Sequence, residues 1–223
     1  MKLVIVLIVV LISGSLTAQE DIKAFFTKVN STYLESDFDI TYTALAYSQP
    51  GLGEELGKGR IARINHGYYV QFGMSEIVYS EKGILSIDHY SKSVRYTKTT
   101  NKQKPTEVNQ LDFLSQINLA DTVFLLSSNK GINEYRFSYK NNVVKSVDII
   151  INQHSYFIES MVYHYQPMDD DTESDFYQLE LNYAKHEVNT SNNKLTDFNE
   201  YLSKSKEGFI YLPDSAYQVN VIN

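Results

Sequence analysis

The first strong pattern in the chain is an amphipathic helix near its beginning. Within residues 19–36, apolar side chains recur at spacings of three and four, at Ile22, Phe25, Phe26, Val29, Tyr33 and Leu34. This spacing places them on one face of an α-helix. A helix with one apolar face, followed by a β-rich chain, is expected to pack across a sheet.

From Asp37 the pattern changes to a period of two, which is typical of strands because alternate side chains of a strand share a face. The strands predicted in this part are 38–49, 60–65, 68–73, 75–90 with a turn inside it, and 92–100. Short connections at 65–67, 81–83 and 89–92 predict tight turns and therefore an antiparallel meander. The stretch PGLGEELGKG, residues 50–59, is predicted to be a loop because it holds four glycines and a proline.

The middle of the chain returns briefly to helical spacing. Val108, Leu111, Leu114 and Ile117 predict a second helix, and the compact apolar run 123–126 predicts a strand or a buried turn. Strand periodicity then resumes over 134–142, 144–152, 155–166 and 175–188, followed by a short helix or turn at 195–205 and closing strands within 208–213 and 216–223. No repeat and no low-complexity linker interrupts the series, so one domain is expected.

Residues 1–18 have the layout of a secretory signal peptide. Lys2 is followed by an apolar run from Leu3 to Ile12 and then by small and polar residues that end in Ala18-Gln19. The run is too short to span a bilayer, which needs about 20 apolar residues. The expected organisation is therefore a signal peptide over 1–18 and a single domain over 19–223, located in the periplasm. Without a cysteine for a lipid anchor, the mature protein is expected to be soluble.

Composition and motifs argue against several classes of function. The net charge of −7 argues against a nucleic-acid partner, because phosphate contacts need clustered Lys and Arg. The acidic run from Asp169 to Glu180 imitates a calcium loop but has Ser174 where the turn needs glycine, so no metal site is expected. The five histidines are scattered and no nucleophile motif is present, so neither catalytic residues nor cofactors are predicted.

The stretch GKGRIARINHGYYVQFGMSEIVYSEKGILSIDHYSKSVRY, residues 57–96, resembles the periplasmic lipoprotein-carrier (LolA-like) family. The family's turn pattern is matched by Ser80-Glu81-Lys82-Gly83, and the positions that follow it are matched by Leu85, Ile87-Asp88, Lys92 and Val94. The order of the remaining segments agrees loosely over most of the mature chain. Two positions depart from the family: Ser86 replaces a frequent tryptophan, and Tyr69 stands near the place of an arginine.

The resemblance implies an α+β, mainly β fold, an incomplete antiparallel barrel whose open side is covered by helices. It implies a non-catalytic monomer that carries lipid, or the acyl chains of a lipidated client protein, between inner- and outer-membrane transfer proteins. The alternative is an exported structural or protein-interaction domain on the same scaffold. The residues predicted to line the apolar cavity are Tyr42, Val70, Phe72, Val78, Leu85 and Ile87.

The exported protein is expected to begin near Gln19. N-terminal sequencing of protein recovered from the periplasm measures this directly. Retention of Met1 in a membrane fraction would contradict the signal-peptide prediction.

Overall fold

The computed structural model describes residues 21–98, 118–140, 143–166, 177–186, 194–206 and 208–222. The signal-peptide prediction and nearly all of the predicted second helix lie outside these ranges. Residues 21–35 form the N-terminal helix, as predicted. No helix in the described ranges has the length and apolar content to cross a membrane.

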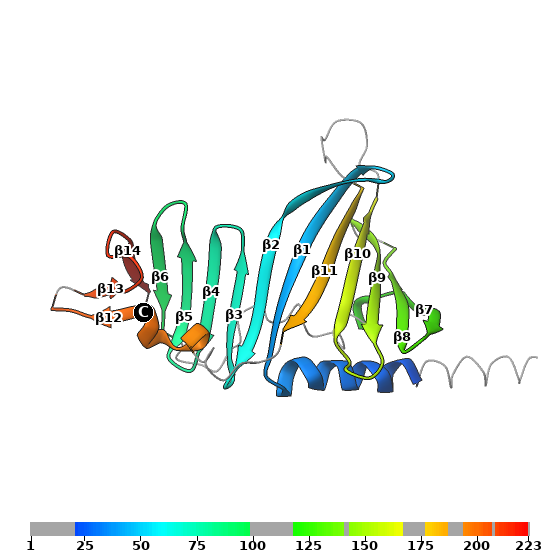
Figure 1. The fold of residues 1–223 in the computed structure, drawn as a ribbon, viewed down its shortest axis with the longest axis horizontal. Helices are drawn as coiled ribbons and strands as arrows, with labels where there is room; N and C mark the ends of the chain where they lie inside the picture. Colours follow the sequence, from blue (N-terminus) through cyan, green and yellow to red (C-terminus); the bar gives the residue numbers. More distant parts are fainter. Residues whose placement is uncertain are drawn as a thin grey trace, which may run out of the picture.

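Twelve strands form one sheet in the order β14-β6-β5-β4-β3-β2-β1-β11-β10-β9-β8-β7 (Figure 1). The first meander contains β1 (Phe38–Gln49), β2 (Leu52–Ile64), β3 (Gly67–Phe72), β4 (Ser75–Ser80), β5 (Gly83–Asp88) and β6 (Ser93–Thr97). The second contains β7 (Thr122–Asn129), β8 (Ile132–Ser138), β9 (Val144–Asn152), β10 (Ile158–Tyr165) and β11 (Gln178–His186). The C-terminal segment adds the 3-10 turn η2 (Phe198–Glu200), the hairpin β12 (Leu202–Lys204) with β13 (Phe209–Tyr211), and β14 (Gln218–Ile222).

The predicted mainly β architecture is confirmed, with differences in detail. The last strand, β14, runs parallel to β6, so the sheet is mixed rather than wholly antiparallel. The described residues include one covering helix where several were expected, and what they show is a large sheet rather than an incomplete barrel. The run 123–126, predicted to be a strand or a buried turn, is part of strand β7.

The loop predicted at 50–59 is wrong, because this stretch is mostly the first half of β2. Only Pro50 and Gly51 turn the chain, and Gly51 has the positive φ of 81° that such a turn requires. Gly53 and Gly59 lie inside the strand directly opposite Tyr47 and Tyr42 of β1. A side chain on either glycine would overlap the neighbouring tyrosine ring. These glycines therefore mark the close approach of aromatic rings, not flexibility.

The N-terminal helix packs on one face of the sheet, called here the helix face. Its buried Phe26, Val29 and Tyr33 contact rings and aliphatic groups of β1, β8, β9 and β10. The Tyr33 hydroxyl accepts a hydrogen bond of 2.9 Å from the Ile158 amide, and Arg63 donates one of 2.9 Å to the Glu35 carbonyl at the helix end. A helix of this length is only marginally stable in isolation, so its packing against the sheet stabilises it.

A second core lies on the opposite face, called here the C-terminal face. Ile61 and Ala62 are adjacent on β2, yet Ile61 packs with the helix-face core and Ala62 with this second core. The C-terminal segment covers it with Phe198, Tyr201 and Tyr211. The helix thus covers the β1 and β7–β11 half from one side, and the C-terminal segment covers the β2–β6 half from the other.

Polar contacts fasten the C-terminal segment to the sheet. His89 bridges the Glu76 carboxylate and the Tyr217 hydroxyl, with 2.7 Å to each. The Thr196 hydroxyl donates a hydrogen bond of 3.2 Å to the Ile64 carbonyl, inside the buried region. Because these groups reach strands β2, β4 and the turn after β5, the segment is held along much of its length.

Leu85→Ala is expected to lower the free energy of unfolding by about 2–5 kcal/mol, because a fully buried side chain is removed from the second core. Leu52→Ala is the matched control, since Leu52 is exposed and should change stability by less than about 0.5 kcal/mol. Urea unfolding followed by circular dichroism measures both. Equal, small effects would mean that Leu85 faces an open cavity rather than a packed core.

Candidate binding site

Each core lies on one face and covers only half of the sheet. Among the described residues, part of each face is therefore left without a covering element. On the helix face the open part begins at Tyr183 of β11 and Tyr42 of β1 and extends over β2–β4, beside the helix. On the C-terminal face it lies over β11 and β1, beside the C-terminal segment. Each open part has its own chemistry, the first aromatic and aliphatic, the second polar.

The open part of the helix face carries a row of aromatic rings across four strands. Tyr183 of β11 lies opposite Tyr42 of β1, which lies opposite Gly59, which in turn lies opposite Phe72 of β3. The rings of Tyr42 and Phe72 are stacked, with centroids 6.0 Å apart and planes 5° apart, because Gly59 leaves room between them. Tyr183 meets Tyr42 at 5.7 Å. These three rings are called the aromatic row.

Aliphatic side chains extend the row into a wall. Ile61, Val70 and Ile77 follow one another across β2, β3 and β4 on the same face, and all three are partly buried. At the other end, the Tyr183 hydroxyl contacts the sulfur of Met161 at 3.6 Å. Ile61, Met161 and Tyr183 also pack against the helix-face core, so the wall continues that core outward.

The wall carries no charge near neutral pH. Burial raises the pKa of Tyr42 above its ordinary value. Burial also raises the pKa of Tyr183, with smaller contributions from the neighbouring tyrosines Tyr163, Tyr33 and Tyr42. Both phenols therefore stay protonated, and the surface they form is apolar with a few polar tips.

The six predicted cavity residues do not share one surface. Tyr42, Val70 and Phe72 lie together on this wall, and Phe72 is 42% exposed. Val78, Leu85 and Ile87 point to the C-terminal face, at most 2% exposed, beneath the C-terminal segment. A single concave face for all six is thus wrong, because the pairing register puts the second three on the other side of the sheet. Sequence reasoning missed Tyr183, whose pairing with Tyr42 is set by long-range register, and Gly59, which was predicted to lie in a loop.

The space beneath the helix is filled by rings. Phe26 lies 4.9 Å from Tyr135 and 5.3 Å from Phe137, edge to face, and Tyr33 packs on Phe38 and Phe157 at 5.3 Å each. Such arrangements are the favoured geometry of a packed aromatic core. A ligand on the helix face therefore has to lie on the wall beside the helix rather than below it.

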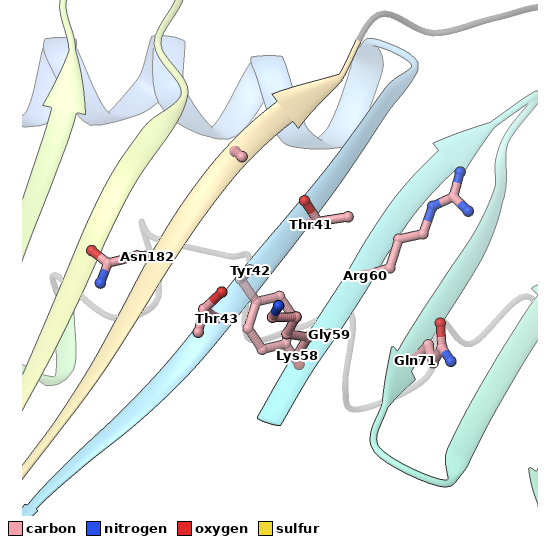
Figure 2. Close-up of a pocket in the computed structure, with 9 residues that line it drawn as sticks. Thr41, Tyr42, Thr43, Lys58, Gly59, Arg60, Gln71 and Asn182 are labelled. Carbon is pink, nitrogen blue, oxygen red and sulfur yellow. The ribbon is translucent and has the colours of Figure 1, made fainter. Parts of the chain in front are cut away.

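The open part of the C-terminal face holds a pocket of about 330 Å³. Figure 2 shows its side chains on neighbouring strands of the sheet. Their residues are Thr41, Tyr42, Thr43, Lys58, Gly59, Arg60, Gln71, Asn182 and Ala184. The lining combines hydroxyl, amide and cationic groups with a larger apolar surface, so it does not by itself select a polar ligand.

Most charged groups around the pocket are paired with a neighbouring group. Arg60 donates two hydrogen bonds to the buried Asp39, from Nε to Oδ1 at 2.8 Å and from Nη2 to Oδ2 at 2.5 Å. The hydrogen bond to Asp39 is the main reason that the pKa of Arg60 is raised. Asn182 donates to Glu180, which also accepts a bond of 2.6 Å from the Tyr47 hydroxyl. Lys58 is exposed and lies 4.0 Å from Glu55, a weak ion pair in water.

Within the described ranges, no three His, Asp or Glu side chains converge as metal ligands would. The acidic run that imitates a calcium loop lies mostly outside those ranges. The closest approach of such groups to one another is in pairs: Glu76 with His89, and Asp148 with His164 at 2.9 Å. Burial pushes the pKa of Asp148 upward, but hydrogen bonds from Arg136 and His164 outweigh it and leave that pKa below its ordinary value. Both pairs are explained as structural hydrogen bonds between neighbouring segments of the sheet.

No protein-family model and no curated protein sequence matches the chain. Among solved structures it is similar to an uncharacterized conserved protein from Thermus thermophilus, with a TM-score of 0.45 and 10% identity over 92% of this chain and 99% of that one. It is also similar to a chain of the Pseudomonas aeruginosa MucA/MucB complex, with a TM-score of 0.47 and 6% identity over 79% of this chain and 61% of that one.

A LolA superfamily protein from Nitrosomonas europaea is similar as well, with a TM-score of 0.35 and 7% identity over 79% of this chain and 97% of that one. At these TM-scores the matches say nothing about what this chain binds.

Gly59→Ala is expected to destabilise the protein by about 1 kcal/mol, because the added methyl group displaces the Tyr42 ring. In a Tyr42→Ala background the same change should cost nothing, since the ring is gone. Denaturant unfolding of the two single variants and the double variant measures the coupling. Independent, additive effects would show that the ring does not lie over Gly59.

Proposed function

We propose that the protein is a non-catalytic carrier that binds an acyl chain, of a lipid or of a lipidated client protein, along the wall on the helix face. It receives this cargo from an inner-membrane donor and delivers it to an outer-membrane acceptor. The observation that carries the proposal is the aromatic row of Tyr183, Tyr42 and Phe72, which is uncharged, continuous with the core and partly open to solvent.

The dimensions and energetics of the wall suit an acyl chain. Its rings span four neighbouring strands, which is about 14 Å at the usual strand spacing of about 4.8 Å. Each methylene removed from water contributes about 0.8 kcal/mol, so a chain of several carbons is held without a charged anchor. Tyrosine and phenylalanine rings also accept different chain positions, because their contacts are not directional. The resemblance of residues 57–96 to the lipoprotein-carrier family agrees with this use of the wall.

The second candidate function, an exported protein-interaction domain, is favoured by one feature, the edge strand β7. Phe124, Leu125 and Leu126 are exposed there, and the strand TVFLLSSN has neither a charge nor a proline to block pairing with another strand. A domain of this kind would bind a protein partner and show no affinity for acyl chains. The two candidates therefore differ in what the wall binds.

Phe72→Glu is expected to weaken binding of an acyl-chain fluorophore about tenfold, because the charge prevents burial of roughly two methylenes at the end of the row. The fold should survive, since Phe72 is partly exposed. Fluorescence titration gives the affinities, and circular dichroism checks the fold.

Tyr90→Glu is the matched control, an equally drastic change at an exposed aromatic residue in the β5–β6 turn, away from the wall. It should bind the fluorophore like the parent protein. If the parent binds no fluorophore, or if both variants bind as well as the parent, the carrier proposal fails.

A further inference from the structure

One line of directly opposed residues crosses the helix face of the sheet from β2 to β14. Its members, in order, are Ile61, Val70, Ile77, Ser86, Arg95 and Asn220. Directly opposed residues of neighbouring strands point to the same side of a sheet. The first three belong to the wall described above, and the last three add a hydroxyl, a guanidinium and an amide. The line, called here the graded row, therefore changes from aliphatic to polar as it leaves β4.

Burial on the opposite face places the polar end of the graded row on the same face as the wall. The strand neighbours of Ser86 and of Arg95 are all buried in the second core; they are Leu85, Ile87, Val94 and Tyr96. Because successive side chains of a strand alternate, Ser86 and Arg95 point the other way, and both are exposed. Figure 1 shows β5 and β6 at the end of the sheet away from the N-terminal helix.

Arg95 differs from the other arginines of the protein in its partners. The sequence holds four arginines, and three bond to an aspartate on or beside a neighbouring strand: Arg60 to Asp39, Arg63 to Asp37 and Arg136 to Asp148. Arg95 has no such partner within the part of the chain that the structure describes. Its planar guanidinium is therefore free to bind a carboxylate from outside the protein, a group that it matches with two parallel hydrogen bonds.

Asp88, the acidic side chain on this face of β3–β6, is occupied by its own turn. Its carboxylate accepts hydrogen bonds from the Tyr90 amide at 2.9 Å and from the Ser91 hydroxyl at 2.7 Å. The bond from the Ser91 hydroxyl is the main reason that the pKa of Asp88 lies below its ordinary value. Asp88 lies opposite Ser93, two residues from Arg95, so its negative charge opposes a ligand that carries more than one negative charge.

The length and gradient of the graded row fit a straight chain with an anionic end. From Ile61 on β2 to Arg95 on β6 there are four strand spacings, or about 19 Å at the usual spacing of about 4.8 Å. This is the length scale of an extended long-chain fatty acid. The chain would cover the aliphatic side chains of β2–β4, and the carboxylate would then lie at β5 and β6.

We infer that the cargo of the wall is a long-chain fatty acid whose carboxylate is bound by the Arg95 guanidinium. The Ser86 hydroxyl and the Asn220 amide, opposite Arg95 on either side, supply neighbouring donors. This inference rests on the proposed carrier function and names the class of lipid that it carries. Contacts of the chain with the wall supply most of the affinity, and Arg95 supplies the selection for a free carboxylate.

The test is fluorescence titration of the exported protein with a fluorescent polyene fatty acid and with the methyl ester of the same acid. The parent is expected to bind the acid about fivefold more tightly than the ester, as an ion pair at an exposed site contributes little more than this. Arg95→Gln should bind the acid as weakly as the ester and leave ester binding unchanged. The fold should survive, since Arg95 is exposed, and circular dichroism checks this.

Lys92→Gln is the matched control, because it removes the same charge from an exposed position in the β5–β6 turn. It should keep the preference of the parent for the acid. If the parent binds acid and ester equally, or if both variants lose the preference equally, the inference is overturned and the carrier proposal stands. If the parent binds neither compound, the carrier proposal fails as well. Displacement of the fluorescent acid by phosphatidylglycerol at lower concentration than by palmitic acid would also overturn the inference, by assigning Arg95 to a phosphate headgroup.

Discussion

The antiparallel pairing of β1 with β11 is the contact on which the rest of the structure depends. It runs from Asp39 opposite His186 to Tyr47 opposite Gln178 and joins two meanders that are far apart in the chain. Closing so long a loop costs conformational entropy, although that cost grows only slowly with loop length. Once the pairing forms, the strict alternation of strand side chains decides which residues of both meanders share a face. A shift of one residue would exchange the faces of every side chain on one meander.

The two faces are covered by different parts of the chain, and this explains where ligands can bind. The helix buries the helix face over one half of the sheet, and the C-terminal segment buries the other face over the other half. The open surfaces meet at the central strands β1, β2 and β3. Tyr42 and Gly59 belong to the helix-face wall and also line the pocket behind it, together with their neighbours Thr41, Thr43 and Arg60. One strand segment thus serves an apolar surface and a polar one at the same time.

Glycines on β2 connect the sheet's geometry with its proposed function. Gly53 and Gly59 each accommodate a tyrosine ring from β1, and Gly57 lies under the Phe72 ring. The absence of a side chain at Gly59 leaves room for the Tyr42 ring to stack on Phe72, while Tyr47 lies over Gly53 on the other face of the sheet. The same glycines let β2 continue as an extended strand into the tip of the β1–β2 hairpin, which carries Leu52 and Leu56 away from the body of the sheet. The wall and the exposed tip are therefore two results of one local pattern.

Much of the secondary structure was determined by the sequence alone. The helix at 21–35 follows from apolar residues at spacings of three and four, and β9 follows from an alternation whose predicted bounds match the structure. These are local patterns, decided by neighbours within a few residues. The glycine-rich stretch 50–59 was misjudged because glycine marks both loops and sites of close ring approach, and only the ring of Tyr42 across the strand tells them apart.

The candidate site was decided by the tertiary structure. Tyr42, Val70 and Phe72 share a surface with Tyr183, whereas Val78, Leu85 and Ile87 lie on the other face under the C-terminal segment. The alternation within a strand predicts which residues lie on the same face, but not which of the two faces of the assembled sheet this is. That choice depends on pairing register between distant strands and on which element covers each face. Short turns set the register within β3–β6, but the pairing of Tyr42 with Tyr183 and the element that covers each face depend on contacts between residues more than a hundred positions apart.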